Sequence, residues 1–209
     1  ALWCSSLAFL VEAAAELGEP TDRYRRLLQR ATAGFRRFWN AERGYCFDVL
    51  DGPDGNDPAL RPNQILAASL PVRALPDDQL RAVVRVCERA LLTPAGLRSL
   101  APGEPGYRPH YGGDQRARDG AYHQGTVWAW LIGPFVEAHL AVFGDVARLE
   151  RLLRPLGDQL RIEGLGTVNE IFEGAAPHAP RGCIAQAWSV AELLRAWSLV
   201  ERAKRAAGA

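Results

Sequence analysis

The chain has 209 residues, and its 25 Lys and Arg side chains against 24 Asp and Glu give a formal net charge of +1 at pH 7. This length suits one sizeable domain, so we expect a single cooperative unit over residues 1–209. Because charges of both signs are interspersed, the sequence lacks the basic stripe of a nucleic-acid-binding protein. No apolar stretch approaches the roughly 20 residues that a membrane span needs. Neither nucleic acid nor a membrane is therefore an expected partner.

The cysteines indicate the redox environment of the chain, and its first residues indicate whether an N-terminal portion is missing. The cysteines stand far apart without a C-x-x-C pair, which argues against a zinc or redox motif and favours reduced thiols at Cys4, Cys46, Cys87 and Cys183. We expect a cytoplasmic chain without a metal site. The sequence has no methionine, and an apolar helical pattern begins at its first residues. We therefore expect it to be part of a longer polypeptide whose N-terminal portion is missing.

Apolar residues recur at helical spacing along much of the chain, with abundant Ala and Leu and few β-branched runs. The pattern predicts an all-α fold with at least six helices, and seven are expected. Their ends follow turn and capping signals such as Gly18, Pro20 and Gly144. The expected helices cover residues 1–17, 21–39, 62–71, 76–91, 123–143, 145–162 and 182–204.

The connections between these helices alternate between short turns and long segments. The long segments, residues 40–61, 92–122 and 163–181, are rich in Gly, Pro, Asp and aromatic residues. If consecutive helices run antiparallel, every long loop emerges at the same end of the assembly. Functional sites are usually built on such gathered loops, so one end of the molecule is the expected place for a site.

The helices differ in how many of their faces are apolar. The segments 65–70, 127–135 and 184–194 carry few charges and are expected to lie inside. The helices 21–39, 76–91 and 145–162 are Arg-rich on one face and are expected to lie outside. Alternating inner and outer helices describe an α/α toroid, of which this chain would supply about half, a partial (α/α)6 barrel. A helical-repeat scaffold is the alternative, but no repeat of fixed period is visible.

Three junctions between a long loop and a helix carry the candidate site residues. At the first, Arg61, Asn63 and Gln64 stand at the start of an expected inner helix. Polar side chains beside a proline at the first helical position are also ordinary helix-start chemistry. The junction therefore suggests a binding role without requiring one.

The second junction is the richest, because residues 119–130 combine a carboxylate, a tyrosine, a histidine, an amide and two tryptophans. Rings that cover C–H faces, beside groups that hydrogen-bond hydroxyls, suit a flat hydroxyl-rich ligand such as a sugar. The candidate binding residues are Tyr111, Asp114, Arg118, Asp119, His123, Gln124 and Trp128. The alternative is a capped helix whose tryptophans fill a core, with Asp119 in an exposed ion pair. No His or Cys stands at ligand spacing from His123, which argues against a metal.

The third junction contains the candidate catalytic carboxylate, Glu170, and a further aromatic candidate, Trp188. The apolar neighbours Val168, Ile171 and Phe172 would desolvate Glu170 and favour its protonated form, which a nearby arginine would oppose. Either state suits a base that activates water. The alternative is a charge on the surface of a loop.

Several blocks, taken together and in order, resemble the C-terminal glucosidase domain of the glycogen debranching enzyme family. The resemblance covers nearly the whole chain. The blocks are Arg61-Pro-Asn-Gln64, Tyr111-Gly-Gly-Asp114, Arg118-Asp-Gly-Ala-Tyr-His-Gln-Gly-Thr-Val-Trp128, Asn169-Glu-Ile-Phe-Glu-Gly174 and Gly182-Cys-Ile-Ala-Gln-Ala-Trp-Ser189. Ala129 stands where the family often has proline, a change that should not disturb the first turns of a helix.

The resemblance implies an (α/α)6 barrel that hydrolyses α-1,6-linked glucose in glycogen or limit dextrin, without a cofactor. Such inverting enzymes use an acid and a base on opposite sides of the sugar ring. By motif position Glu170 matches the base, and the other candidates match the sugar-binding wall. The acid, an Asp in a Trp-Met-Asp-like loop, would precede residue 1. Since losing such a group costs roughly 10²–10⁴-fold in rate, we expect the chain alone to be nearly inactive.

Two other readings stay open. Related α/α-barrel glycosidases act on trehalose, on glycosylglycerates or on N-glycan glucose. The chain could also be a glycan-binding fragment without catalytic activity. A panel of substrates distinguishes the other glycosidases from a debranching enzyme. Binding measurements on variants of Trp128 and Glu170 distinguish a glycan-binding fragment from an enzyme.

Overall fold

The computed structural model describes residues 1–162 and 165–208, and it is mostly helical with several short strands. Residues 163–164, at the start of the expected loop 163–181, lie outside the described part. The expectation of an all-α fold is confirmed for its bulk, but it did not include the small sheets that form in the segments between the helices. The partial barrel stays a prediction.

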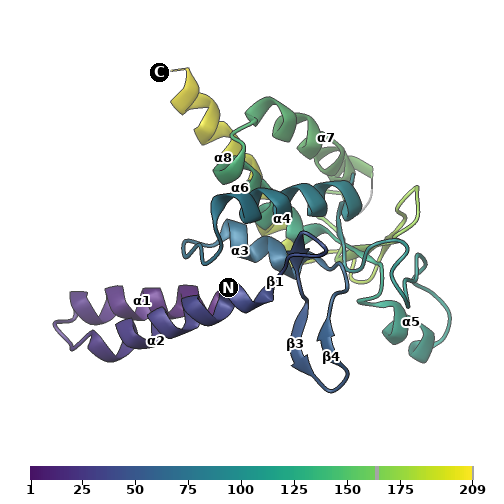
Figure 1. Ribbon diagram of the computed structural model, residues 1–209. Coiled ribbons are helices and arrows are strands. Elements are labelled where there is room, and N and C mark those ends of the chain that lie inside the picture. Colours follow the sequence, from purple (N-terminus) through teal and green to yellow (C-terminus); the bar gives the residue numbers. More distant parts are fainter. Residues whose placement is uncertain (163–164, 209) are drawn as a thin grey trace.

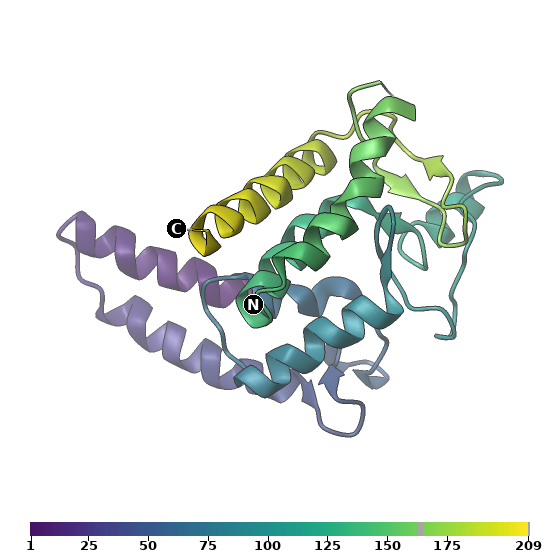
Figure 2. The ribbon, with the colours of Figure 1, turned by 90° about the horizontal axis from the view of Figure 1, so that it is seen from above.

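The first two helices, α1 (Leu2–Glu16) and α2 (Asp22–Phe35), form a hairpin that projects away from the other helices (Figure 1, Figure 2). Gly18 after α1 has φ +73, a conformation that glycine adopts readily at a helix end. α2 buries no residue, whereas α1 buries Cys4, Leu7 and Ala14. The expected helix 21–39 is shorter, since a 3-10 turn, η1 (Arg36–Phe38), follows α2.

The main body packs around α6 (Ile132–Val142), which contacts α3 (Leu66–Ser69), α4 (Asp77–Ala90) and α8 (Ala187–Ala207). Phe135 and Val136 of α6 are fully buried. Burying a side chain of this kind stabilises the fold by about 1.5–3 kcal/mol. α6 is thus an inner helix, as expected, while α4 and α7 (Val146–Ile162) each bury one apolar face.

α8 differs from the expected inner helix. It buries Leu193, Ala196 and Val200, but Trp188 and Leu194 are 46% and 65% exposed. Its first expected turns are absent as well. α8 begins at Ala187, because the backbone amide of Cys183 donates to Glu170 and that of Gln186 to the carbonyl of Val168.

A five-stranded antiparallel sheet joins the long segments to one another. In sheet order its strands are β5 (Leu92–Thr93), β6 (Gly96–Arg98), β7 (Val127–Trp128), β8 (Ile171–Phe172) and β9 (Pro180–Arg181). Trp128 pairs with Leu97 on one side and with Ile171 on the other. The sheet therefore brings segments that are distant in sequence to one edge of the helical body.

This sheet also corrects the expected helix 123–143. Residues 127–128 form a strand, and helical structure begins with the 3-10 turn η3 (Ala129–Leu131) that leads into α6. The β-branched Val127 is buried between two neighbouring strands, so strand pairing determines its conformation instead of the helical spacing of apolar residues.

The remaining elements belong to the long segments. Two hairpins pair β1 (Trp39–Asn40) with β2 (Tyr45–Cys46), and β3 (Val49–Gly52) with β4 (Gly55–Asp57). The 3-10 turn η2 (Pro62–Ile65) precedes α3, and a short helix, α5 (Gln115–Ala121), lies inside the expected loop 92–122. Among the described residues, no helix is both long and apolar enough to cross a membrane.

Candidate functional site

A hollow of about 460 Å³ opens where the first and second junctions meet the start of α8. We call it the aromatic hollow. It brings together six of the residues that the sequence predicts to bind substrate, which are Arg61, Asn63, His123, Gln124, Trp128 and Trp188. Residues of the three junctions thus lie together, as the gathered long loops predict, and their contacts with substrate stay predictions.

One wall of the aromatic hollow is a group of rings. The indole N–H of Trp128 donates to the carbonyl of Tyr122 and to the hydroxyl of Thr126, each at 3.2 Å. The ring of His123 lies parallel to Trp128 with 5.0 Å between centroids, and Trp188 meets Trp128 edge-on at 6.0 Å. Trp130 stacks on Trp188 at 5.4 Å. The buried Trp128 supports the more exposed rings of His123 and Trp188, and exposed rings of this kind can cover the C–H face of a sugar.

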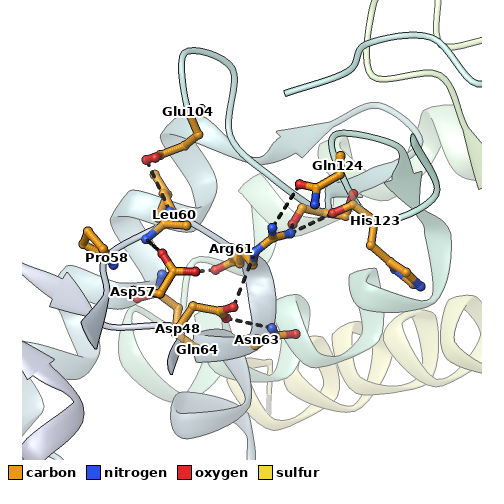
Figure 3. A network of polar contacts seen from close by, with 12 residues as sticks. Asp48, Asp57, Pro58, Leu60, Arg61, Asn63, Gln64, Glu104, His123 and Gln124 are labelled. Carbon is orange, nitrogen blue, oxygen red and sulfur yellow. Dashed lines mark hydrogen bonds and ion pairs between the residues drawn. The ribbon is translucent and has the colours of Figure 1, made fainter. Parts of the chain in front are cut away.

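Another wall is polar and centres on Arg61 (Figure 3). Its guanidinium donates to the carbonyls of Ser99 at 3.1 Å and His123 at 2.7 Å, and to the side chain of Gln124 at 3.0 Å. Its Nε lies 3.4 Å from the carboxylate of Asp48. Arginine has five donor hydrogens, so about one remains for a ligand. Arg61 therefore mainly holds the turn at residues 123–124 against the first junction.

Glu170 lies directly before strand β8, and three groups donate to its carboxylate. The Tyr122 hydroxyl and the Gln186 side chain reach Oε1 at 2.5 and 3.3 Å, and the Cys183 amide reaches Oε2 at 3.1 Å. An ionised carboxylate offers about four lone-pair sites, so about one remains for a water molecule.

Tyr122 links Glu170 to the aromatic hollow. Its ring lies 4.8 Å from His123 and 4.9 Å from Trp128, between centroids. Burial raises the pKa of the Tyr122 phenol, and the neighbouring Glu170 carboxylate raises it further. The phenol consequently stays protonated and keeps donating to Glu170 at any physiological pH.

His123 is a hydrogen-bonding group in its neutral form. Burial lowers the pKa of its imidazole, Arg61 lowers it further, and Glu170 opposes the change. At neutral pH the ring is therefore uncharged and offers one donor and one acceptor.

Comparison with known proteins identifies the family. A sequence model described as amylo-alpha-1,6-glucosidase matches residues 1–195. The chain belongs to this family. A curated relative, the glycogen debranching enzyme of Saccharomyces cerevisiae, is 34% identical over 104 residues, which are 46% of this chain and 7% of that enzyme.

Solved structures resemble the fold of this glucosidase-family chain. A GH63 mannosylglycerate hydrolase from Thermus thermophilus, in complex with glucose, superposes with a TM-score of 0.68 at 20% identity, covering 93% of this chain and 45% of that one. An uncharacterized conserved protein from the same organism gives 0.66 at 19% identity, covering 93% and 44%. The chain thus spans less than half the length of these relatives.

Four predicted binding residues do not line the aromatic hollow of the glucosidase-family chain. Tyr111 packs against Tyr122 with 5.8 Å between centroids, and Asp114 caps α5 by accepting from the Ala117 amide at 2.8 Å. Arg118 donates to the Gly113 carbonyl at 2.6 Å. Asp119 is exposed, and the ion pairs among the described residues do not include it. Their roles toward substrate stay predictions.

The third junction is also held by contacts of the residues that follow Glu170. The carboxylate of Glu173 lies 2.8 Å from the Arg181 guanidinium and 3.1 Å from the His110 ring. The amide of Gly174 donates to the Pro109 carbonyl at 2.8 Å. These contacts fasten the second junction to the third, so the segment that carries Glu170 is held from both sides.

Asp48 of this glucosidase-family chain lines the aromatic hollow but was not predicted from the sequence. Trp130, the second tryptophan of the predicted stretch 119–130, lines it too. Nothing in the sequence around Asp48 marks it. Within residues 1–162 and 165–208, no group of three His, Cys, Asp or Glu side chains is arranged to hold a metal ion.

Proposed function

We propose that this chain carries the glucosidase site of a debranching enzyme, which hydrolyses α-1,6-linked glucose at the branch points of an α-glucan such as glycogen or limit dextrin. The carboxylate of Glu170 supports this most directly. It is held by three donors, keeps about one lone-pair site for water, and adjoins the aromatic hollow through Tyr122.

In the proposed mechanism Glu170 is the general base of an inverting reaction. Its free lone pair takes a proton from a water molecule as that water attacks the anomeric carbon. The glucosyl ring lies against the aromatic wall, and a carboxylic acid about 6.5–9.5 Å from Glu170 protonates the leaving oxygen. We propose that this acid comes from a segment outside residues 1–209, as the resemblance implies.

The test uses Glu170→Gln in the full-length protein, with Glu201→Gln on α8 as a matched control. Glutamine keeps the shape of the side chain but cannot accept the proton, so glucose release from limit dextrin should fall at least about 100-fold. Glucose binding, measured by the fluorescence of the tryptophans in the hollow, should change little. Full turnover in Glu170→Gln would remove Glu170 from the base role.

The stereochemistry of the product tests the inverting mechanism separately. Inversion at an α-linkage releases β-glucose first, which polarimetry or proton NMR detects before the anomers equilibrate. Initial release of α-glucose would show that the reaction retains configuration.

A glycosylglycerate hydrolase is the second candidate. It is supported by the resemblance in fold to the mannosylglycerate hydrolase. The full-length protein should be assayed on limit dextrin, trehalose and mannosylglycerate side by side. Release of glucose from limit dextrin alone supports debranching. Turnover of mannosylglycerate alone supports the second candidate, and turnover of trehalose alone contradicts both.

A further inference from the structure

Asp48 is a largely buried carboxylate in the polar wall of the aromatic hollow, and the motifs of the sequence did not point to it. Its side chain is 14% exposed. One oxygen accepts from the Asn63 amide at 2.9 Å, and the other lies 3.4 Å from Nε of Arg61 (Figure 3). The residue follows strand β2 and precedes β3, so a hairpin segment and the start of η2 hold it from both sides.

Asp48 lies between two hollows, where a ligand can contact it. It lines the aromatic hollow and also a second hollow of about 340 Å³ that includes Phe38 and Phe47. The two hollows share Asp48, Arg61 and Asn63, which together form the partition between them. A ligand that fills the aromatic hollow therefore meets this partition.

The carboxylate of Asp48 keeps capacity for a ligand. Of its roughly four lone-pair sites, two are taken by Asn63 and Arg61 among the described residues. Hydrogen bonds to a charged acceptor are stronger than those between neutral groups. A ligand that donates two hydrogen bonds can satisfy both remaining sites, as adjacent hydroxyls of a sugar do.

The charge of the residues that line the aromatic hollow further limits the kinds of ligand that can bind there. Its lining has two carboxylates, Asp48 and Asp57, against the single guanidinium of Arg61, while His123 is neutral at neutral pH. This balance disfavours an anionic ligand at the polar wall and favours a neutral one that donates hydrogen bonds.

We propose that Asp48 accepts hydrogen bonds from hydroxyls of the glucosyl unit in the aromatic hollow and is a specificity-determining residue of the site. The inference rests on the proposed function, because it takes that unit to be the ligand. The aromatic wall covers one face of the sugar ring, and Asp48 accepts hydrogen bonds from hydroxyls at the edge of that ring. Arg61 and Asn63 position Asp48 for this contact.

The experiment compares Asp48→Asn with Asp51→Asn in the full-length protein. Asp51 is a suitable control because it lies nearby on β3 but pairs with Arg37 and is 68% exposed. Binding of glucose and of each monodeoxyglucose is measured by calorimetry and by tryptophan fluorescence. Asp48→Asn should weaken glucose binding about 10- to 100-fold, and Asp51→Asn less than about twofold.

The deoxy sugars separate hydroxyl recognition from a structural role. At least one monodeoxyglucose, the one without a recognised hydroxyl, should bind the wild type weakly and lose little further affinity in Asp48→Asn. If Asp48→Asn binds glucose like the wild type, or loses the same factor for every deoxy sugar, the inference is overturned and the proposed function stands. If the wild type binds no glucose at all, the proposed function itself fails.

Discussion

Tyr122 is the residue on which the proposed chemistry of Glu170 most depends. Its hydroxyl donates to Glu170, and burial raises its pKa so that the proton stays in place. Tyr122→Phe should therefore lower kcat about 10- to 100-fold, with a much smaller change in KM, because a hydrogen bond to a charged group contributes about 1.5–3 kcal/mol. The backbone carbonyl that anchors Trp128 is kept in this variant.

The control for this prediction is Tyr24→Phe. Tyr24 lies on α2, and the hydrogen bonds of the described residues do not join it to Glu170. Steady-state kinetics on limit dextrin checks both variants. An unchanged kcat in Tyr122→Phe, or an equal loss in Tyr24→Phe, would show that the hydroxyl does not support the base.

The buried His139 should make the free energy of unfolding depend on pH. It is 3% exposed on α6, between Phe135 and Phe143, and the described part of the chain offers its Nδ1 no hydrogen-bond partner. Burial lowers its pKa and Arg148 lowers it further, while Glu88 and Asp145 oppose the change. The unfolded chain then binds more protons below about pH 6.5, so stability is full above that pH and is lost as the pH falls through this range.

The variant His139→Leu should flatten this dependence, because leucine does not titrate and leaves no polar atom without a partner. Urea unfolding midpoints at about pH 7.5 and about pH 5.5 measure the effect. His123 has a pKa shifted in the same direction and keeps its share of the dependence. An identical loss of stability in wild type and variant would show that His139 does not cause it.

Individual site residues were predictable where their types cluster in the sequence. His123, Gln124 and Trp128 stand within one block, and all three line the aromatic hollow. Asp48 could not be found in this way, because its role comes from Arg61 and Asn63, which only the fold brings to it. A lone aspartate in a hairpin carries no local signal of a ligand.

At the scale of elements, the contact between the second and third junctions depends on the absence of a side chain at Gly174. A Cβ there would lie 2.4 Å from the Gly125 carbonyl and 2.8 Å from the Tyr107 hydroxyl. Gly174→Ala should therefore destabilise the fold by about 1–3 kcal/mol, as overpacking does, and loosen the loop that carries Glu170. Gly112→Ala is the control, since a Cβ there meets nothing within 4 Å. Equal urea midpoints in the two variants would contradict this account.

The strands show why element types were only partly predictable. Val127 and Trp128 continue the apolar spacing of the helix after them, so periodicity alone assigns them to it. Their partners, Leu97 on β6 and the β8 residues Ile171 and Phe172, are distant in sequence. Two-residue strands of this kind form only when those segments meet, and a single-sequence pattern does not contain that information. The long, amphipathic helices α4 and α7 were predictable, because the spacing of their apolar residues is enough to identify a helix.

At the scale of the whole molecule, the projecting hairpin of α1 and α2 bears on the prediction that the chain unfolds as one cooperative unit (Figure 2). The main hydrophobic cluster includes buried residues from Tyr45 to Val200, and the buried Leu7 of α1 is not part of it. Leu2, Trp3 and Phe9 of α1 are more than 60% exposed. The hairpin thus has few apolar contacts with the rest of the described chain.

This arrangement predicts that the hairpin opens without unfolding the main body. Amide hydrogen exchange should be faster in α2 (Asp22–Phe35) than in α6 (Ile132–Val142), because segments with little buried apolar surface open at lower free energy. Leu7→Ala, which costs about 2–5 kcal/mol at a buried site, should speed exchange in α1 and α2 and leave α6 unchanged. Val136→Ala, a truncation in the core, should speed exchange in α6. If Leu7→Ala speeds α6 as much as α2, the hairpin and the main body unfold together.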